Sequence, residues 1–429
     1  MTQRTLNDWL AWMEQQHPSA IDLGLDRVQK VWQALGAPQP AKKVVVVGGT
    51  NGKGSTLTYI SQLAMTAGWK TGTYTSPHFL RYNERVAIEG KSVTDEQLCA
   101  VFERIEACQT ALSQQGEVIS LTYFEFGTLA ALLLLAGANL DLAVLEVGLG
   151  GRLDAVNIVS GDVAIVTSVD LDHTDWLGSD REAIGFEKAG IFRPDRLALC
   201  AEPDVPQSLA EHAQTIAARL MKIGESFGID EGNGDYRCYG QLPDGRPWYV
   251  DHIPAPQLPV RNMAPALQAV KWLGIELTDE QCRHALSHAT LTGRFQHMEW
   301  QNRHWLLDVA HNPEAARHLA KWLARNAKGR KVHALCGMLA DKDIEGVLGA
   351  LASSIGHWQL LTLQGARGQT AEGMARRVAH LTSEASIAQA DTVEEALSAL
   401  INVSSADDLI VVFGSFYTVS MALEKMLAG

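Results

Sequence analysis

The chain has 429 residues, of which 46% are hydrophobic and 20% are charged. This composition excludes a largely disordered, fibrous or collagen-like protein, and the length favours two or more domains. Asp and Glu number 49 against 36 Lys and Arg, and the net charge of -13 argues against a protein that coats nucleic acid or an anionic membrane surface.

The cysteine pattern and the N-terminal residues bear on the compartment. Six cysteines are scattered without a CxxC pair, which favours free thiols over a disulfide framework or a zinc site. The N-terminal residues lack the apolar core of a secretion signal, and the apolar run at 129–136 is too short to span a bilayer. We therefore expect a cytoplasmic protein with neither a membrane nor a nucleic-acid partner.

Strand and helix patterns alternate from about residue 40 onward. Short apolar or β-branched runs predict buried strands at 42–47, 71–75, 141–147 and 162–169. Longer stretches with helical spacing predict helices at 55–67, 95–114 and 124–136. Because the strands are apolar throughout, we expect an α/β fold in which helices cover both faces of a parallel sheet.

Residues 224–260 interrupt this alternation with short alternating runs rich in Gly, Pro, Asp and Tyr, which predict a small antiparallel region. Helices are expected at 263–273 and 279–288. A second strand–helix series then predicts strands at 305–310, 332–337, 358–363 and 408–414, with helices from Pro313 and Asp343, at 394–400 and at the C-terminus. We place the domain boundary at 295/296, giving domains 1–295 and 296–429.

The strongest local signal is the phosphate loop, residues 47–56 (VGGTNGKGST), which directly follows a predicted strand and opens a helix. Its glycines allow backbone N–H groups to surround a phosphate, and the helix N-terminus favours negative charge. Lys53 is placed to reach the outer phosphates, with Ser55 or Thr56 near a metal ion. The match to GxxxxGK[ST] is imperfect, since Val47 replaces the first glycine and Gly54 follows the lysine.

A glycine-rich loop of this kind can also arise without a nucleotide phosphate site. A tight strand-to-helix turn without a ligand is the structural alternative. A dinucleotide-binding fingerprint fails, because neither Gly52-x-Gly54 nor Gly148-x-Gly150 is followed by the third glycine.

Polar residues follow three further predicted strands. Ser76 follows the second strand, Glu146 closes the third, and His173 follows the fourth. The carboxyl ends of parallel strands are where open α/β sheets bind ligands. A serine hydroxyl, a carboxylate and an imidazole beside a phosphate loop together predict Mg²⁺ that bridges ATP oxygens. A satisfied loop histidine remains the alternative for His173 alone.

A series of motifs extends this pattern along nearly the whole chain: GGTNGKGST, TSPHFLRYNERV (75–86), EVGLGGRLDAVN (146–157), LDHTDWLG (171–178), EKAGIF (187–192), GRF (293–295), DVAHNP (308–313), GMLADKD (337–343) and GSFYTV (414–419). The series resembles the Mur-type ligases and, more narrowly, the folylpolyglutamate synthases. The resemblance implies a P-loop parallel-sheet ATPase domain followed by a smaller C-terminal α/β domain.

Three segments, DLGLDR (22–27), LTYFE (121–125) and the RLD run at 152–154, resemble the bifunctional bacterial type, which also acts as dihydrofolate synthase. That resemblance implies a pterin–benzoate site formed by these residues: Asp22, Leu23, Gly24, Leu25, Leu121, Thr122, Tyr123, Phe124, Arg152, Leu153 and Asp154. Phe124 would pack against the substrate, and Asp154 would accept hydrogen bonds from pterin N–H groups. Arg152 would balance charge near the substrate or form a surface ion pair.

The family resemblance also implies the nucleotide and metal sites. The ATP-binding residues would be Gly49, Thr50, Asn51, Gly52, Lys53, Gly54 and Ser55, with Asn262, Arg294 and Asp308 contributed by the domain interface and the second domain. Mg²⁺ would be held by Ser76, Glu146 and His173. Lys188 matches a lysine that is carbamylated in the family, where its added carboxylate helps to hold a second Mg²⁺. His311 or the Asp341–Asp343 cluster would position the incoming glutamate.

The residue chemistry fits formation of an amide from a carboxylate. ATP phosphorylates the carboxylate, and the amine of L-glutamate then displaces phosphate from the acyl phosphate. Bringing two anions together requires the compensating charge of Mg²⁺, Lys53 and the loop amides. The expected small-molecule partners are dihydropteroate, reduced folates and L-glutamate, and the expected state is a monomer whose two domains close on the substrates.

Several other classes of protein share parts of this pattern. A GTPase needs an NKxD segment that the sequence lacks, and a pure binding module would not need matched metal ligands. Another Mur-type ligase acting on a UDP-sugar peptide, or a monofunctional folylpolyglutamate synthase, shares the ATPase core and remains the closer alternative. His284 and His288, four residues apart on a predicted helix, are interpreted as surface histidines because no third ligand accompanies them.

Overall fold

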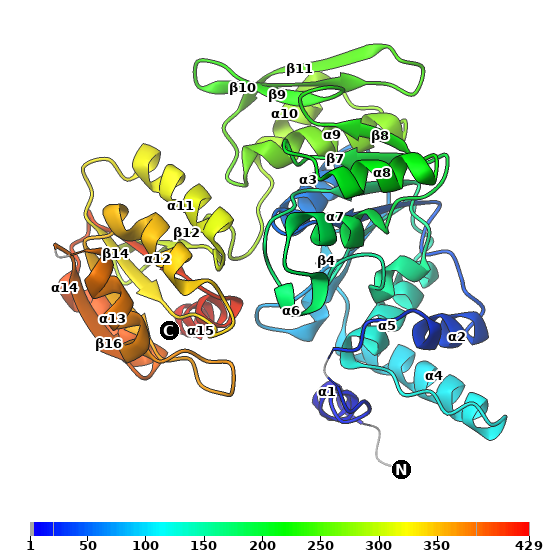
Figure 1. The fold of residues 1–429 in the computed structure, drawn as a ribbon, viewed down its shortest axis with the longest axis horizontal. Helices are drawn as coiled ribbons and strands as arrows, with labels where there is room; N and C mark the ends of the chain where they lie inside the picture. The colour runs from blue at the N-terminus through cyan, green and yellow to red at the C-terminus, as the bar shows by residue number, and fades with distance from the viewer. Residues whose placement is uncertain (1–3, 20, 383, 429) are drawn as a thin grey trace. The chain divides into compact units, whose positions relative to one another are not determined.

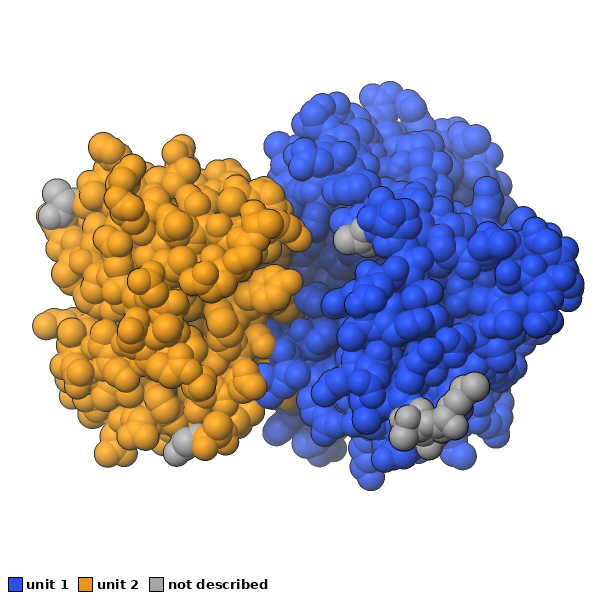
Figure 2. Space-filling view, turned by 90° about the horizontal axis from the view of Figure 1, so that it is seen from below, with its two compact units in different colours: residues 1–289 blue, residues 290–429 orange. Residues whose placement is uncertain are grey.

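The computed structural model describes residues 4–19, 21–382 and 384–428. The chain forms two compact units, residues 1–289 and 290–429 (Figures 1 and 2). The boundary expected at 295/296 lies a few residues beyond this division, directly before the first strand of the second unit. Each unit is built on its own β-sheet and is described separately.

The first unit contains an eight-stranded sheet. In spatial order its strands are β4 (Lys91–Ser92), β3 (Val86–Ile88), β2 (Thr71–Tyr74), β5 (Leu142–Glu146), β1 (Lys43–Gly48), β6 (Val163–Val166), β7 (Leu197–Cys200) and β8 (Arg219–Lys222). From β2 to β8 the strands are parallel, as expected, but β3 and β4 run antiparallel at the edge. Only Glu89 and Gly90 separate β3 from β4, and antiparallel neighbours can be joined by such a tight turn whereas parallel strands cannot.

Helices cover both faces of this sheet (Figure 1). One face carries α1 (Leu6–Met13), α2 (Asp26–Ala34), α4 (Asp95–Gln114), α5 (Tyr123–Gly137), α7 (Arg181–Ala189) and α8 (Gln207–Thr215). Val44 and Val46 point into this core, and Val45 and Val47, which are equally buried, face the opposite side because strand side chains alternate. On that side α3 (Lys53–Thr66) packs against β1, β2 and β5.

The predicted antiparallel region is confirmed. β9 (Gly228–Glu231), β10 (Asp235–Gln241) and β11 (Pro247–Pro254) form a three-stranded antiparallel sheet. It packs on α9 (Met263–Trp272) and α10 (Asp279–Ser287), which in turn pack on α3. This layer therefore supports the helix that the phosphate loop opens.

The second unit contains a six-stranded sheet. Its spatial order is β12 (Gln296–Trp300), β13 (Arg303–Leu307), β17 (Leu409–Phe413), β14 (Val332–Cys336), β15 (His357–Leu361) and β16 (Ser386–Ala390), with only β12 antiparallel among the strands described. One face is covered by α11 (Pro313–Asn326), α12 (Ile344–Leu351) and α13 (Ala371–Leu381), and the other by α14 (Val393–Val403) and α15 (Phe416–Ala428).

The remaining elements are short or were not predicted. They are α6 (Thr174–Leu177), η1 (Tyr82–Arg85), η2 (Ala155–Ile158), η3 (Val260–Asn262) and η4 (Ala352–Ser354). The sequence interpretation also did not assign these elements: β3, β4, β7, β8, β12, β16, α1, α2, α7, α8 and α13. Among the residues that the structure describes, no helix is long and apolar enough to cross a bilayer.

Candidate active site

The phosphate loop leaves the carboxyl end of β1, a central strand that pairs with β5 on one side and with β6 on the other. Two of its glycines are required by close approach. A Cβ on Gly49 (φ +144°) would lie 1.9 Å from Thr167 Oγ1, and one on Gly52 (φ +85°) would lie 2.9 Å from the side-chain amide of Asn262. The backbone therefore adopts this loop only with glycine at both positions.

Lys53 folds back over the loop. Its Nζ donates to the carbonyl oxygens of Gly49, at 2.9 Å, and Thr50, at 3.2 Å. These contacts hold the ammonium group at the mouth of the loop, and neutral carbonyls are partners that an anionic phosphate can readily replace. The predicted position of Lys53 at the loop is thus observed, while its contact with a phosphate stays a prediction.

The loop amides are not all available to a ligand. The N–H of Thr50 donates to the Ser168 carbonyl (3.0 Å), and that of Asn51 donates to Ser168 Oγ (2.9 Å). The first backbone hydrogen bond of α3 runs from the N–H of Thr56 to the Gly52 carbonyl (2.9 Å), and the amides before Thr56 lie at the helix N-terminus. Anion binding is therefore expected at the helix start rather than along the whole loop.

Thr167 and Ser168, which follow β6, shape the loop and were not identified from the sequence. Thr167 Oγ1 donates to the Asn51 carbonyl (2.6 Å) and to the Gly48 carbonyl (3.1 Å). The sequence carries a signal for them, because they are polar residues at the end of a predicted strand, as Ser76 and Glu146 are. The pairing of β6 with β1, which brings them beside the loop, was not predicted.

Asn262 lies against the phosphate loop within the first unit. It is 1% exposed, sits at the start of α9, and its Oδ1 has no hydrogen-bond partner among the described residues. A buried amide oxygen without a donor costs free energy of about 1–3 kcal/mol. Asn262 was expected to contact ATP, and its position against Gly52 supports that assignment.

Two of the three expected Mg²⁺ ligands are neighbours. The N–H of Ser76 donates to Glu146 Oε2 at 3.3 Å, since β2 and β5 are adjacent parallel strands that end together. Glu146 is 7% exposed. A buried carboxylate beside a hydroxyl suits a hard cation that keeps water and phosphate oxygens as its other ligands.

His173 lies at the start of α6 with φ +52°, and its backbone N–H donates to Asp172 Oδ1 at 2.9 Å. Within the described part of the chain, no three His, Cys, Asp or Glu side chains converge as a metal cluster. Ser76 and Glu146 therefore fit the expected ion, and the participation of His173 stays a prediction.

Lys188 is buried in α7. Burial, followed by the positive charge of Lys53, lowers the pKa of its amine to about 7, and the carboxylate of Asp172 opposes this shift. A substantial share of the amine is consequently neutral near physiological pH. Lys53, Lys188 and Asp172 thus influence one another within the first unit, although they lie far apart in the sequence.

The expected pterin segments are joined by Arg27. Its guanidinium contacts Asp22 Oδ2 at 2.8 Å and Glu125 Oε1 at 3.2 Å. Glu125 also completes the capping box of α5, where its carboxylate accepts the N–H of Thr122 at 2.8 Å. The segments 22–25 and 121–124 are therefore brought together as predicted, although Arg27 and Glu125 were not assigned roles.

The third pterin segment meets the others through η2, which packs against α2 and α5. Asp154 is buried, and its two oxygens accept the N–H groups of Leu149 and Val156, each at 2.9 Å. Burial raises the pKa of its carboxyl to about 6 despite these hydrogen bonds. The side chain of Asp154 thus stabilises its own loop, and its contact with pterin stays a prediction.

Arg152 and Phe124 also have structural partners. Arg152 donates from Nε and Nη2 to Glu187 Oε1, at 3.0 and 2.7 Å, which is the ion pair considered as its alternative role. A Cβ on Gly148 would lie only 2.4 Å from the Phe124 ring. Packing of Phe124 is therefore directed at the glycine that follows the strand of Glu146.

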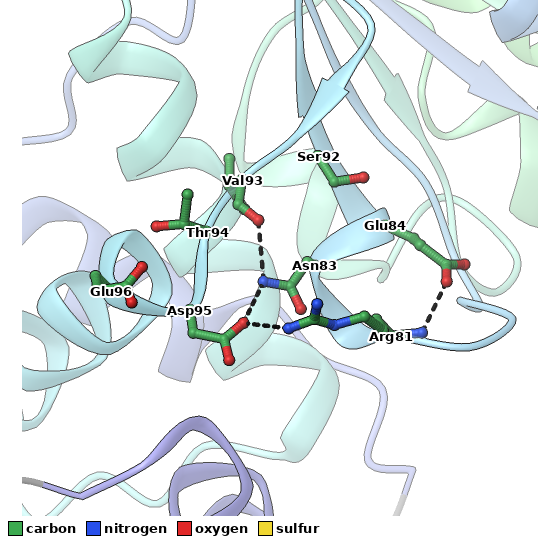
Figure 3. A pocket seen from close by; sticks show the side chains of 8 residues that line it. All are labelled: Arg81, Asn83, Glu84, Ser92, Val93, Thr94, Asp95 and Glu96. Carbon is green, nitrogen blue, oxygen red and sulfur yellow. Dashed lines mark hydrogen bonds and ion pairs between the residues drawn. The ribbon is translucent and has the colours of Figure 1, made fainter.

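The segment between Ser76 and Arg85 borders a polar pocket of about 410 Å³ (Figure 3). Arg81 Nη2 and Asn83 Nδ2 both donate to Asp95 Oδ1, at 2.9 and 2.8 Å. Glu84 accepts the N–H of Arg81 at 2.7 Å. Because Arg81, Asn83 and Glu84 form these hydrogen bonds, we interpret the residues around the pocket as an anchor for the segment that carries Ser76.

In the second unit, Asp308 follows β13 and is 5% exposed. Its oxygens accept the N–H groups of Phe295 (3.0 Å) and Ala310 (2.9 Å). Burial raises the pKa of the Asp308 carboxyl, and the charge of Arg294 opposes the shift. The Arg294 guanidinium lies 5.1 Å from the centre of the Phe416 ring, which also neighbours His311 at 6.3 Å. The structure therefore brings Arg294, Asp308 and His311 to one edge of this sheet.

The Asp341–Asp343 cluster has structural partners. Asp341 pairs with Arg367 at 2.7 Å, and Asp343 caps α12 by accepting the N–H of Gly346 at 2.9 Å. This favours the solvated helix start over a glutamate-positioning role. His284 on α10 and His288 directly after it are exposed, with ring centres 4.3 Å apart, which agrees with surface histidines.

Comparisons with known proteins cover nearly the whole chain. Residues 47–236 match the Mur ligase middle domain, and residues 293–416 match the Mur ligase, glutamate ligase domain. The dihydrofolate synthase/folylpolyglutamate synthase of Escherichia coli (strain K12) is 43% identical over 98% of this chain and 95% of its own length.

Two solved structures have similar folds. E. coli FolC in complex with DHPP and ADP superposes with a TM-score of 0.92 at 41% identity, covering 99% of this chain and 98% of that one. A bifunctional folylpolyglutamate synthase/dihydrofolate synthase from Yersinia pestis, complexed with AMPPNP and Mn ion, gives 0.89 at 42% identity, with coverage of 99% and 98%.

Proposed function

The chain belongs to the dihydrofolate synthase/folylpolyglutamate synthase family of Mur-type ligases, and we propose from this that it adds L-glutamate to dihydropteroate and to reduced folates. The reaction is an ADP-forming ligation that uses ATP and a divalent metal ion. The observation that carries the proposal is the identity of 43% along 98% of the chain. The three segments typical of the bifunctional type converge in the first unit, which supports the same conclusion.

The chain's own residues account for the first chemical step. An oxygen of the acceptor carboxylate attacks the γ-phosphorus of ATP, and ADP leaves. Lys53 and the first amides of α3 attract the phosphates and stabilise the charge that develops on them. A divalent ion held by Ser76 and Glu146 supplies additional positive charge when it is bound. Asn262 has a buried oxygen directed at the loop and orients the nucleotide.

In the second step the amine of L-glutamate attacks the acyl carbon, and the C–O bond to phosphate breaks. The second unit contributes Arg294, Asp308 and His311 to binding of nucleotide and glutamate. An Arg guanidinium is suited to a phosphate or carboxylate because it presents paired N–H donors. The carboxylate of Asp308 holds the backbone at this edge of the sheet by accepting the N–H groups of Phe295 and Ala310.

We also assign carbamylation to Lys188. Its neutral amine, favoured by a pKa of about 7, attacks CO₂, forms the N–C bond and releases a proton, which leaves a carbamate anion. The product is a buried anion near the charge of Lys53, and it favours a second Mg²⁺. ¹³C-bicarbonate labelling should give a carbamate resonance that is lost in Lys188→Ala. Absence of that resonance in the active wild-type enzyme contradicts the assignment.

Phosphate release measured with different acceptors distinguishes this function from that of the other Mur-type ligases. The purified protein receives ATP, Mg²⁺ and L-glutamate, and candidate acceptors are added one at a time. Dihydropteroate and tetrahydrofolate should each stimulate release, whereas a UDP-sugar peptide should not. Stimulation by the peptide alone contradicts the proposal. The monomeric state and cytoplasmic location remain expectations from the sequence.

A further inference from the structure

A row of polar side chains crosses the amino end of the second unit's sheet, away from the edge that carries Asp308 and His311. His333 of β14 is in register with His357 of β15, and His357 is in register with Ser386 of β16. Asp408 directly precedes β17, the other neighbour of β14. Parallel strands begin at one edge and end at the other, so this row is separate from the nucleotide and glutamate residues.

Each histidine has one ring nitrogen engaged. His333 Nε2 lies 3.0 Å from Asp408 Oδ2, and His357 Nδ1 lies 2.7 Å from Ser386 Oγ. The other two nitrogens, His333 Nδ1 and His357 Nε2, are buried and have no hydrogen-bond partner among the residues that the structure describes. The ring centres are 5.6 Å apart, so both nitrogens belong to adjacent rings.

The carboxylate fixes the proton on His333. Ionised Asp408 can only accept, so Nε2 of His333 carries a hydrogen, and in the neutral ring that a metal ion would bind, Nδ1 supplies the lone pair. His333 is 6% exposed, and a buried ring nitrogen without a hydrogen-bond partner is unfavourable. A ligand that accepts this lone pair would recover that free energy.

We propose that His333 and His357 bind one divalent transition-metal ion of the zinc type through His333 Nδ1 and His357 Nε2. The arrangement matches a recurrent feature of such sites, in which a ligating histidine donates its other ring N–H to a carboxylate. Imidazole nitrogen suits Zn²⁺, Cu²⁺ and Ni²⁺, whereas Mg²⁺ prefers oxygen. Neighbouring strands are about 4.8 Å apart, a spacing that two side chains with metal–nitrogen bonds of about 2.0–2.1 Å can bridge.

The chemistry of the neighbours agrees with this assignment. His357 Nδ1 is engaged by Ser386 Oγ at 2.7 Å, which leaves Nε2 as the nitrogen available to a metal ion. No third His, Cys, Asp or Glu completes a metal cluster in the described ranges, so the proposed site has two protein ligands. Asp408 also accepts the N–H of Ser405 at 2.8 Å, which fixes the carboxylate that orients His333.

Zn²⁺ titration of the full-length protein tests the proposal. The metal-stripped protein is titrated calorimetrically in excess Mg²⁺ and ADP, which fill the sites formed by oxygen ligands. The protein also carries the substitutions His284→Ala and His288→Ala, which remove a second pair of neighbouring histidine rings. We expect one Zn²⁺ per chain. His357→Ala and His333→Gln should abolish this binding, and Asp408→Asn should weaken it about 10- to 100-fold.

His304→Ala is the matched control, because His304 lies on the same sheet in β13 and is half-buried. It should leave Zn²⁺ binding unchanged. His357→Ala keeps the buried His333–Asp408 pair, so it remains informative if His333→Gln does not fold. Zn²⁺ binding that is unchanged in His357→Ala, or no saturable Zn²⁺ binding by the folded background protein, overturns the proposal.

Cu²⁺ provides a spectroscopic readout independent of activity. The electron paramagnetic resonance spectrum of one equivalent of Cu²⁺ should show coupling to two imidazole nitrogens, and His357→Ala should reduce it to one. A spectrum identical in wild type and His357→Ala contradicts the assignment of the ligands.

Discussion

The phosphate loop and the pterin region of the first unit are built in different ways. The loop is a contiguous run whose shape depends on two close-packed glycines and on hydrogen bonds with Thr167 and Ser168. The pterin region is assembled from three distant segments that ion pairs and a buried carboxylate hold together. Residues in the loop are thus free to serve chemistry, whereas residues in the pterin region must also maintain the fold.

This difference predicts how substitutions separate activity from stability. Lys53 donates to two backbone carbonyls, and a neutral acceptor at the mouth of a loop loses little when water replaces its donor. Arg27, in contrast, faces Glu125, whose side chain is only 5% exposed. Removing a cation from a buried carboxylate destabilises the fold because the remaining charge is poorly solvated.

The largest expected effect is that of Lys53→Ala. Loss of a preorganised charge at the phosphates should lower glutamate-dependent ADP release about 10²–10³-fold. Thermal unfolding should remain close to that of wild type, because water can replace the ammonium group at the loop carbonyls. Lys91→Ala, at an exposed position on β4, is the control. Near wild-type turnover in Lys53→Ala would remove the loop from the mechanism.

Glu146→Gln should have the next largest effect. The substitution keeps the shape and the contact with Ser76 but removes the charge that favours a hard cation. The Mg²⁺ concentration for half-maximal activity should rise about tenfold or more, and His173→Ala should change it in the same direction. If both variants give the wild-type Mg²⁺ titration curve, the ion is bound elsewhere.

Arg27→Ala tests the other side of the comparison. It should lower the free energy of unfolding by about 1–3 kcal/mol, because Glu125 loses its cation, and it should raise KM for dihydropteroate. Arg4→Ala is the matched control, because it also removes an arginine from an ion pair. Its partner Glu106 is 35% exposed, so this substitution should lower the free energy of unfolding by less. Equal destabilisation by the two variants would contradict the role given to Arg27.

Asp154 gives the most specific effect, a pH dependence of stability. The pKa of its carboxyl is about 6 in the folded chain and 3.8 as the reference value. Between these values the folded state binds the proton and the unfolded state does not, so stability falls as pH rises from about 4 to 6. The contribution is on the order of 1–3 kcal/mol.

Urea unfolding of wild type and Asp154→Asn at several pH values measures this contribution. The substitution removes one backbone acceptor at every pH, so the informative quantity is the change of the difference with pH. Wild type should lose stability relative to Asp154→Asn between about pH 4 and 6. A difference that is constant across this range would show that the carboxyl of Asp154 titrates normally.

The contrast also explains what the sequence could predict. The loop, its lysine and the polar residues at strand ends were identified because each lies in a short motif next to an apolar strand. The bonds of Arg27 to Asp22 and Glu125 were not predicted, since nothing in the local sequence relates residues 27 and 125. The structural role of Asp154 was also missed, because its hydrogen bonds depend on how residues 149–156 fold back on themselves.

Errors in the fold prediction have a similar origin. β16 was not assigned, because it carries polar residues such as Ser386 and Gln389. The antiparallel strands β3 and β4 were not expected, since the apolar pattern indicates burial but not direction. Long-range pairing, which places Ser168 beside Asn51 and His333 beside His357, required the structure.

Product analysis with dihydropteroate tests the central claim most directly. The purified protein is incubated with ATP, Mg²⁺, L-glutamate and either dihydropteroate or tetrahydrofolate, and products are identified by mass spectrometry. Both acceptors should gain glutamyl units, and dihydropteroate should give dihydrofolate only when ATP and glutamate are present. Extension of tetrahydrofolate without conversion of dihydropteroate would contradict bifunctionality, and extension of neither would contradict the assigned reaction.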